Sequence, residues 1–189
     1  ISLCIDSKGL YFDATKASDL EDILNKYDFK NDRELLEKAR ICKKLIIDLD
    51  LSKYNNVQKK TTEEIYGQKN RKRILVIGQV EDDASIQYGC LKKMTNNDLV
   101  MATVVENPDA EVIYKPHPDV LFGKRKAYSN PEDVKQFAKV IEEPLSLPDS
   151  FKTIDHVYTM TSLAGFEALM RGIPVTTFGC PFYSGWGLT

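Results

Sequence analysis

Three acidic residues, Glu81, Asp82 and Asp83, follow the short apolar run at 74–77. A carboxylate just beyond a buried strand can act as a nucleophile or as a general base. It can equally cap a helix, because the side-chain oxygen of Asp accepts from backbone N–H groups of the first turn. Asp83 is therefore a candidate catalytic carboxylate, with Asp82 as runner-up, and the capping role stays open. Gln79, in the same loop, is a candidate ligand contact.

A histidine between two prolines follows the next apolar run, at 111–114. The segment reads Lys115-Pro116-His117-Pro118, and its prolines restrict the backbone, so the imidazole is presented from a stiff loop. An imidazole can donate to a phosphate or protonate a leaving group near neutral pH. Lys115 can neutralise an anion beside it. A structural turn is the competing interpretation, because proline is common where strands end.

A hydroxyl-rich turn leads into a short predicted helix at 163–170. Thr161 and Ser162 precede this helix, and Leu163 and Gly165 lie in its first turn. A helix N-terminus offers backbone N–H groups and the positive end of its dipole to a phosphate. Glycine there lets a ligand or a neighbouring segment approach closely. In the simpler interpretation the hydroxyls only cap the helix.

Two further features lie beside this turn. Glu167 is either a solvated carboxylate or an acceptor for ribose hydroxyls. The segment 179–187 is rich in aromatic residues and glycine, which suits ring stacking or a lid.

The arrangement of the strands and helices determines whether these three clusters lie close together in the folded chain. Short apolar runs bounded by turn residues predict strands, and the stretches between them predict helices. The expected strands are 74–77, 111–114, 138–141, 156–159 and 175–178, with helices near 85–93, 131–137 and 163–170. This alternation predicts right-handed crossovers and a parallel, doubly wound, Rossmann-like α/β sheet. Ligands bind such sheets beyond the carboxyl ends of the strands, where all three clusters fall.

The N-terminal part of the chain has a different pattern. Weak alternation around a turn predicts a hairpin within 1–15. Ser18 begins a capping box that predicts a helix at 18–27, and Asp32 is expected to cap a longer helix with one apolar face.

A basic segment at 51–73 precedes the first expected strand. It reads either as a solvated loop or as a basic rim for an anionic acceptor or a lipid surface. We divide the chain into a lead-in of hairpin and helices at 1–70 and a Rossmann-like domain at 71–189.

Composition excludes several classes of protein. The 189 residues carry a formal net charge of -2, which gives no overall attraction to nucleic acid. No apolar run approaches the roughly 20 residues of a membrane span, and no signal peptide is recognisable. The four cysteines and two histidines show no metal-ligand spacing, so no metal is expected and a reducing cytoplasm is the simpler setting. Dinucleotide, P-loop and GxSxG motifs are missing.

Several longer motifs occur in order along the chain: YFDAT at 11–15, LSKYN at 51–55, GQVEDDAS at 78–85, KPHP at 115–118, SLAGFEAL at 162–169, GIPV at 172–175 and FYSGWGLT at 182–189. Together they resemble the capsule polysaccharide synthesis family typified by KpsC. The resemblance implies a retaining β-Kdo glycosyltransferase of the GT-B type. Its donor would be CMP-β-Kdo, with no other cofactor, and its acceptor a phosphatidylglycerol-linked Kdo chain, reached in the cytoplasm with peripheral contact at the inner membrane.

The resemblance also implies roles for particular residues. Asp83 matches the acidic motif and would be the nucleophile, His117 belongs to the His-Pro motif at the CMP, and Ser162 to the hydroxyl motif at its phosphate. A GT-B enzyme has two Rossmann-like halves, and one is expected here, with 1–70 holding the edge of the acceptor half. The chain also begins without Met. We therefore expect a fragment with donor binding and little or no transfer activity alone.

Two alternatives from other classes remain. One is a non-catalytic module that binds a nucleotide sugar or an anionic glycan in the same cleft. The other is an export or assembly component that docks through the basic residues at 59–73.

Overall fold

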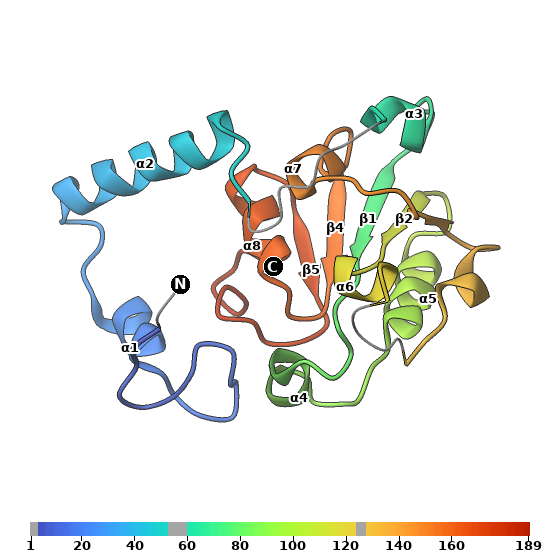
Figure 1. The fold of residues 1–189 in the computed structure, drawn as a ribbon. Coiled ribbons are helices and arrows are strands. Elements are labelled where there is room, and N and C mark those ends of the chain that lie inside the picture. Colours follow the sequence, from blue (N-terminus) through green and yellow to red (C-terminus); the bar gives the residue numbers. More distant parts are fainter. Residues whose placement is uncertain (1–3, 53–59, 124–127) are drawn as a thin grey trace.

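A sheet of five parallel strands forms the centre of the computed structural model, which describes residues 4–52, 60–123 and 128–189 (Figure 1). The strands lie in the order β3-β2-β1-β4-β5. Their bounds are β1 (Arg73–Ile77), β2 (Glu111–Lys115), β3 (Lys139–Val140), β4 (His156–Thr159) and β5 (Val175–Thr177). The predicted α/β fold with a parallel Rossmann-like sheet is confirmed.

The strand order creates a switch point beside the central strand. Strands β2 and β3 lie on one side of β1, and the connection after β3 crosses over so that β4 and β5 lie on the other side. The loops that leave the carboxyl ends of β1 and β4 therefore diverge, which opens a crevice between them. β1 is buried along its whole length because it pairs with a strand on each side and has helices on both faces.

Alternate residues of β1 face two separate cores. Leu75 and Ile77 pack in one cluster, and Ile74 and Val76 in the other. The first cluster includes residues of α3 (Thr62–Tyr66) and α8 (Leu163–Met170), with α7 (Leu147–Ser150) beside it. The second includes residues of α4 (Ala84–Gly89), α5 (Asn96–Glu106) and the 3-10 helix η1 (Pro131–Val134). A further short helix, α6 (Pro118–Leu121), follows β2.

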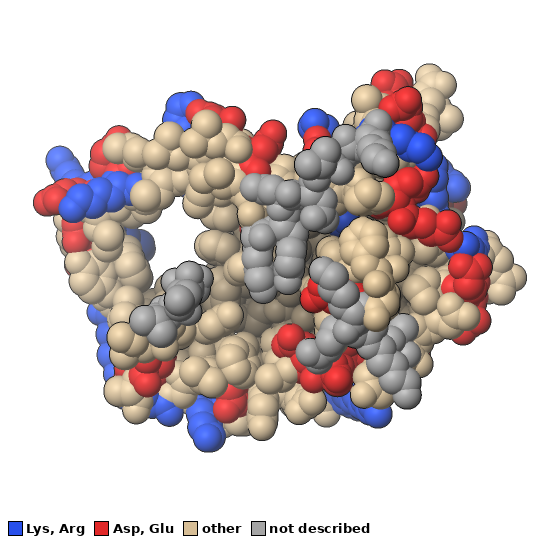
Figure 2. Space-filling view, in the orientation of Figure 1, with Lys and Arg blue, Asp and Glu red and all other residues tan. Residues whose placement is uncertain are grey.

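Two N-terminal helices stand away from this body (Figures 1 and 2). They are α1 (Asp19–Lys26), capped by Ser18, and α2 (Arg33–Asp48), capped by Asp32, both as predicted. Neither helix has a buried residue, although α2 carries an apolar stripe in which Leu35 is 39% and Leu45 is 50% exposed. The stripe is present as expected, but the described residues offer it no partner.

The predicted N-terminal hairpin is wrong for the part that the structure describes. Residues 4–15 form turns and no strand, because Asp6 accepts from the backbone N–H groups of Lys8 and Gly9 and so closes the chain locally. Residues 1–3 lie outside the described residues. Side-chain acceptors of this kind compete with strand pairing.

Two predicted helices are shorter than expected, and others were not predicted. The helix expected at 85–93 ends at Gly89, and that expected at 131–137 is only the 3-10 turn η1. α5 was missed because its apolar residues do not form one stripe, since it packs against the sheet and η1 together. α3 lies inside the segment 51–73 that was read as a loop or a basic rim, and its Ile65 and Tyr66 are buried.

The basic residues of that segment are mostly engaged with acidic partners. Lys60 pairs with Glu143, and Lys69 pairs with Asp155. Arg73 is buried and pairs with Glu111. Lys and Arg alternate with Asp and Glu around the face in Figure 2, so this view shows no patch of one sign. Residues 53–59 lie outside the described residues.

Candidate functional site

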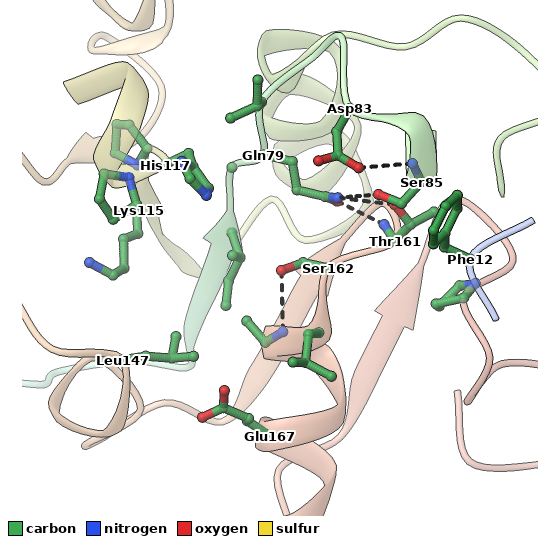
Figure 3. A pocket seen from close by; sticks show the side chains of 18 of the residues that line it. Phe12, Gln79, Asp83, Ser85, Lys115, His117, Leu147, Thr161, Ser162 and Glu167 are labelled. Carbon is green, nitrogen blue, oxygen red and sulfur yellow. Dashed lines mark hydrogen bonds between the residues drawn. The ribbon is translucent and has the colours of Figure 1, made fainter. Parts of the chain in front are cut away.

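The main cavity, of about 420 Å³, lies beyond the carboxyl ends of β1, β2 and β4 (Figure 3). Of the ten residues predicted for the site, eight line it: Gln79, Asp83, Lys115, His117, Thr161, Ser162, Leu163 and Glu167. Asp82 and Gly165 do not line it. The topology thus brings together side chains that lie more than eighty positions apart in the sequence.

Gln79 joins the ends of the two strands at the switch point. Its Oε1 accepts from Thr161 N at 2.8 Å, and its Nε2 donates to Thr161 Oγ1 at 3.0 Å. Thr161 Oγ1 in turn donates to Ser85 Oγ at 3.1 Å. Gln79 is buried, and both ends of its amide are used by the protein. Its side chain therefore holds the crevice walls together, and it also lines the cavity in which it was predicted to contact a ligand.

Asn96, the first residue of α5, holds the backbone of the acidic loop. Its Oδ1 accepts from Gln79 N and its Nδ2 donates to Gln79 O, both at 2.9 Å. The backbone N–H of Asn96 also donates to Glu81 Oε1 at 2.6 Å. Glu81 accepts as well from the backbone N–H groups of Tyr128 and Ser129. The first of the three acids is thus a structural anchor, not a free carboxylate.

The other two acids are exposed but differ in direction. Asp83 lines the cavity and caps α4, with its Oδ1 accepting from Ser85 N at 2.8 Å. The capping role that the sequence left open is therefore present, and the same side chain also lines the cavity. Figure 3 shows Asp83 and Ser85 at one end of the cavity, near Phe12. Asp82 does not line the cavity, so its position disfavours it as the alternative carboxylate.

His117 and Lys115 approach the cavity from the neighbouring strand end. His117 caps α6, and its Nδ1 accepts from Asp119 N at 3.1 Å, which puts the proton of a neutral imidazole on Nε2. Lys115 Nζ donates to the carbonyl oxygen of Leu145 at 2.7 Å. Burial lowers the pKa of Lys115 to about 8, because its charge is costly to remove from water. At neutral pH Lys115 is still a cation.

The N-terminus of α8 forms another side of the cavity. Ser162 caps the helix, with its Oγ accepting from Ala164 N at 3.2 Å. Gly165 does not line the cavity. A Cβ there would lie 2.2 Å from Tyr183 Oη, and that hydroxyl donates to Ser162 O at 2.5 Å. The glycine therefore leaves room for Tyr183, which holds the capping residue Ser162 in place. Of the two reasons given for a glycine here, close approach of a neighbouring segment is the one that the structure shows.

Glu167 lies at the opposite end of the cavity from Asp83, near Leu147 (Figure 3). It is buried, and its Oε1 accepts from Ser52 Oγ at 3.3 Å. Arg171, one turn later, places Nη1 3.8 Å from Glu167 Oε2. Glu167 is therefore not a solvated surface acid, and its carboxylate already accepts from a hydroxyl group of the protein.

Sequence reasoning missed several residues of the lining. Leu145 and Leu147 supply an apolar wall, and Ser85 and Phe12 lie at the Asp83 end. The two leucines follow β3, so extending the carboxyl-end rule to that strand would have found them. The same rule could not find Phe12, because Phe12 does not follow a predicted strand. It belongs to the N-terminal segment, which packs against the strand ends only in the folded structure.

No group of three or more His, Cys, Asp and Glu side chains among the described residues is arranged to hold a metal ion. No helix in the described part of the chain is both long and apolar enough to cross a membrane.

Comparison with known proteins identifies the family. The family model described as capsule polysaccharide biosynthesis protein matches residues 1–189. The chain belongs to this family. It is 49% identical over its whole length to the lipopolysaccharide-processing protein LpsZ of Rhizobium meliloti, of which it covers 43%. It is 41% identical to the capsule polysaccharide modification protein LipA of Neisseria meningitidis serogroup B, of which it covers 26%.

Solved structures of KpsC from Thermosulfurimonas dismutans have the same fold. The chain aligns over 97% of its length with the β-Kdo 2,4 transferase, with a TM-score of 0.87 and 38% identity, and covers 56% of that chain. The β-Kdo 2,7 transferase aligns with a TM-score of 0.78 and 38% identity, and 54% of it is covered. This capsule family member thus spans less than half of the curated relatives and about half of the two transferases.

Proposed function

We propose that this chain is the donor-binding part of a glycosyltransferase that transfers Kdo, with retention, from CMP-β-Kdo to a lipid-linked Kdo acceptor during capsule synthesis. One observation carries the proposal. Asp83, His117 and Ser162, which come from three separate loops, line one cavity at the switch point of the sheet. The likeness to two Kdo transferases supports the choice of donor sugar.

The nucleotide would occupy the part of the cavity between Glu167 and the start of α8. Glu167 would accept from the ribose hydroxyls. The phosphate would lie between the N-terminus of α8 at Ser162 and the side chain of His117, because helix N–H groups and an imidazole N–H donate to anions. Lys115 would neutralise the phosphate or the Kdo carboxylate. The presence of each of these side chains in the cavity lining supports these roles.

The sugar would then lie at the Asp83 end, where transfer with retention can proceed through two inversions. The Asp83 carboxylate would attack the anomeric carbon as the bond to the phosphate oxygen breaks, and CMP would leave with His117 stabilising its phosphate. An acceptor hydroxyl would then attack the anomeric carbon as the bond to Asp83 breaks, which frees the carboxylate, and the hydroxyl proton would pass to solvent water. The cavity position of Asp83 supports it over Asp82 for this role.

The lead-in at 1–70 would contribute the edge of an acceptor-binding half. The exposed apolar stripe of α2 supports this placement, because such a stripe is normally covered by another element. The acceptor would be a phosphatidylglycerol-linked Kdo chain, reached at the cytoplasmic face of the inner membrane. Transfer by these 189 residues alone is then expected to be weak or undetectable.

Calorimetric titration with CMP tests the donor site directly. We expect one CMP to bind per chain, and His117→Ala to weaken binding about tenfold or more, as for the loss of a hydrogen bond to a charged group. His156→Gln is the matched control, since His156 lies on β4 and bonds to Thr176, outside the cavity lining. A folded chain that does not bind CMP would contradict the proposal.

Mass spectrometry after incubation with CMP-Kdo tests the carboxylate role. The unmodified chain should gain the mass of one Kdo group, and Asp83→Asn should not. Asp82→Asn should behave as the unmodified chain does. An adduct that persists in Asp83→Asn would remove Asp83 from the mechanism, and CMP binding that survives with no adduct in either form would favour a binding module.

A further inference from the structure

We propose that a second cavity, of about 190 Å³, binds the acceptor sugar as a hydroxyl-bearing pyranose. This second cavity lies between the N-terminal segment 11–24 and the C-terminal loop 180–186. The inference rests on the proposed function, because it takes the main cavity to be the donor site.

The second cavity adjoins the main cavity across a wall of ring-bearing side chains. Tyr11, Pro181 and Phe182 line both cavities. The rings of Tyr11 and Phe182 meet edge to face, with centroids 5.9 Å apart. Phe12, next to Tyr11, lies at the Asp83 end of the main cavity (Figure 3). A molecule in the second cavity is therefore on the side where the sugar of the donor is expected.

The lining of the second cavity has the chemistry that binds a pyranose. Trp186 and Tyr11 offer aromatic surface for the C–H face of a sugar ring. Asp13 and Glu21 are carboxylates, which accept from sugar hydroxyls, and Lys16 donates to ring or carboxylate oxygens. With two acids and one base, the lining favours a sugar that has many hydroxyl groups and a single carboxylate, which Lys16 can pair with, over a phosphate group.

The N-terminal wall of this cavity is held by its own hydrogen bonds. Asp6 Oδ2 accepts from Asp19 N at 2.8 Å, and Asp19 Oδ2 accepts from Ser7 N at 2.6 Å. Ser18 Oγ accepts from Glu21 N at 3.1 Å, which fixes the start of α1. The segment is thus ordered before a ligand arrives, and little conformational entropy is lost on binding.

The C-terminal wall is held in the same manner. Trp186 Nε1 donates to Phe182 O at 2.9 Å, and Ser184 Oγ donates to Pro181 O at 2.9 Å. Trp186 is 39% exposed, so part of its surface stays available for contact with a sugar.

Tryptophan fluorescence tests the proposal, because Trp186 is the only tryptophan in the chain. The probe is the methyl β-glycoside of Kdo, titrated with and without saturating CMP. We expect a saturable change in emission under both conditions. Glu21→Gln and Asp13→Asn should each weaken the apparent affinity about threefold to tenfold, as expected for single hydrogen bonds. Glu34→Gln, an exposed acid on α2, is the matched control and should leave it unchanged.

The outcomes separate this inference from the proposed function. If CMP binds and the glycoside produces no change in emission, the second cavity is not an acceptor site, whereas the donor site stands. If CMP displaces the glycoside, the glycoside enters the main cavity and the inference is wrong. If CMP itself does not bind to the folded chain, the proposed function fails regardless of the glycoside result. Circular dichroism of each variant shows that a lost signal is not lost folding.

Discussion

Replacing Lys115 with methionine should stabilise the protein and weaken CMP binding. Lys115 lines the main cavity, and burial lowers its pKa from 10.5 to about 8. Since one pKa unit corresponds to about 1.4 kcal/mol, this difference means that burying the cation costs about 3 kcal/mol of free energy. Methionine removes that cost and also the hydrogen bond from the charged ammonium group to Leu145 O, which is worth about 1.5–3 kcal/mol. The net expected gain in unfolding free energy is up to about 1.5 kcal/mol at about pH 7.5.

The change of unfolding free energy with pH gives a second, independent test of the burial cost of Lys115. The folded-state pKa of Lys115 is lower than the unfolded-state pKa, so the unfolded chain binds more protons between about 8 and 10.5. Unfolding free energy should therefore rise with pH in this window, by about 2 kcal/mol between about pH 7.5 and about pH 9.5. Lys115→Met should lack this rise. Urea denaturation of both forms across the window measures the difference.

CMP binding should change in the opposite direction. A charged hydrogen bond to phosphate is worth about 1.5–3 kcal/mol, so Lys115→Met should weaken CMP about tenfold to a hundredfold at about pH 7. Affinity of the unmodified chain should fall as pH rises through about 8, because the cation is lost, and this fall should be absent in the variant. Lys92→Met, at an exposed position, is the control. A variant that is less stable, or that binds CMP as well as the unmodified chain, would refute the reasoning.

Three further substitutions test the packing around the site and the exposure of α2. Gly165→Ala should lower the unfolding free energy by about 2–3 kcal/mol, because the added Cβ would meet Tyr183 Oη. The loss should be smaller when Tyr183 is also replaced by phenylalanine, and equal losses in both backgrounds would contradict this contact. Asn96→Ala should lower the unfolding free energy, measured by urea denaturation, by about 2–3 kcal/mol, because the buried backbone N–H and C=O groups of Gln79 lose their partners. A change under about 0.5 kcal/mol would show that these two hydrogen bonds do not stabilise the fold. Leu45→Gln should stay within about 0.5 kcal/mol, because Leu45 is half exposed, and a larger loss would mean that α2 is covered in solution.

The regular elements near the site were predicted well where the pattern was local. β4 and α8 begin and end where expected, because an apolar run between turn residues and a capped helix are both short-range signals. Gly172 ends α8 with a φ of +78°, a conformation that glycine adopts without strain. α5 was not predicted, because its burial on more than one side removes the amphipathic stripe on which such a prediction depends.

The sequence by itself determined the parallel α/β sheet, the family and eight of the residues that line the main cavity. Strand periodicity, caps and motifs are local, so they can be read without coordinates. Tertiary structure alone decided which role each polar residue has. Gln79 and Glu81 were indistinguishable in sequence from ligand contacts, yet their atoms are used by Thr161 and by backbone N–H groups of distant segments. Such pairings depend on long-range packing, which spacing along the chain does not encode.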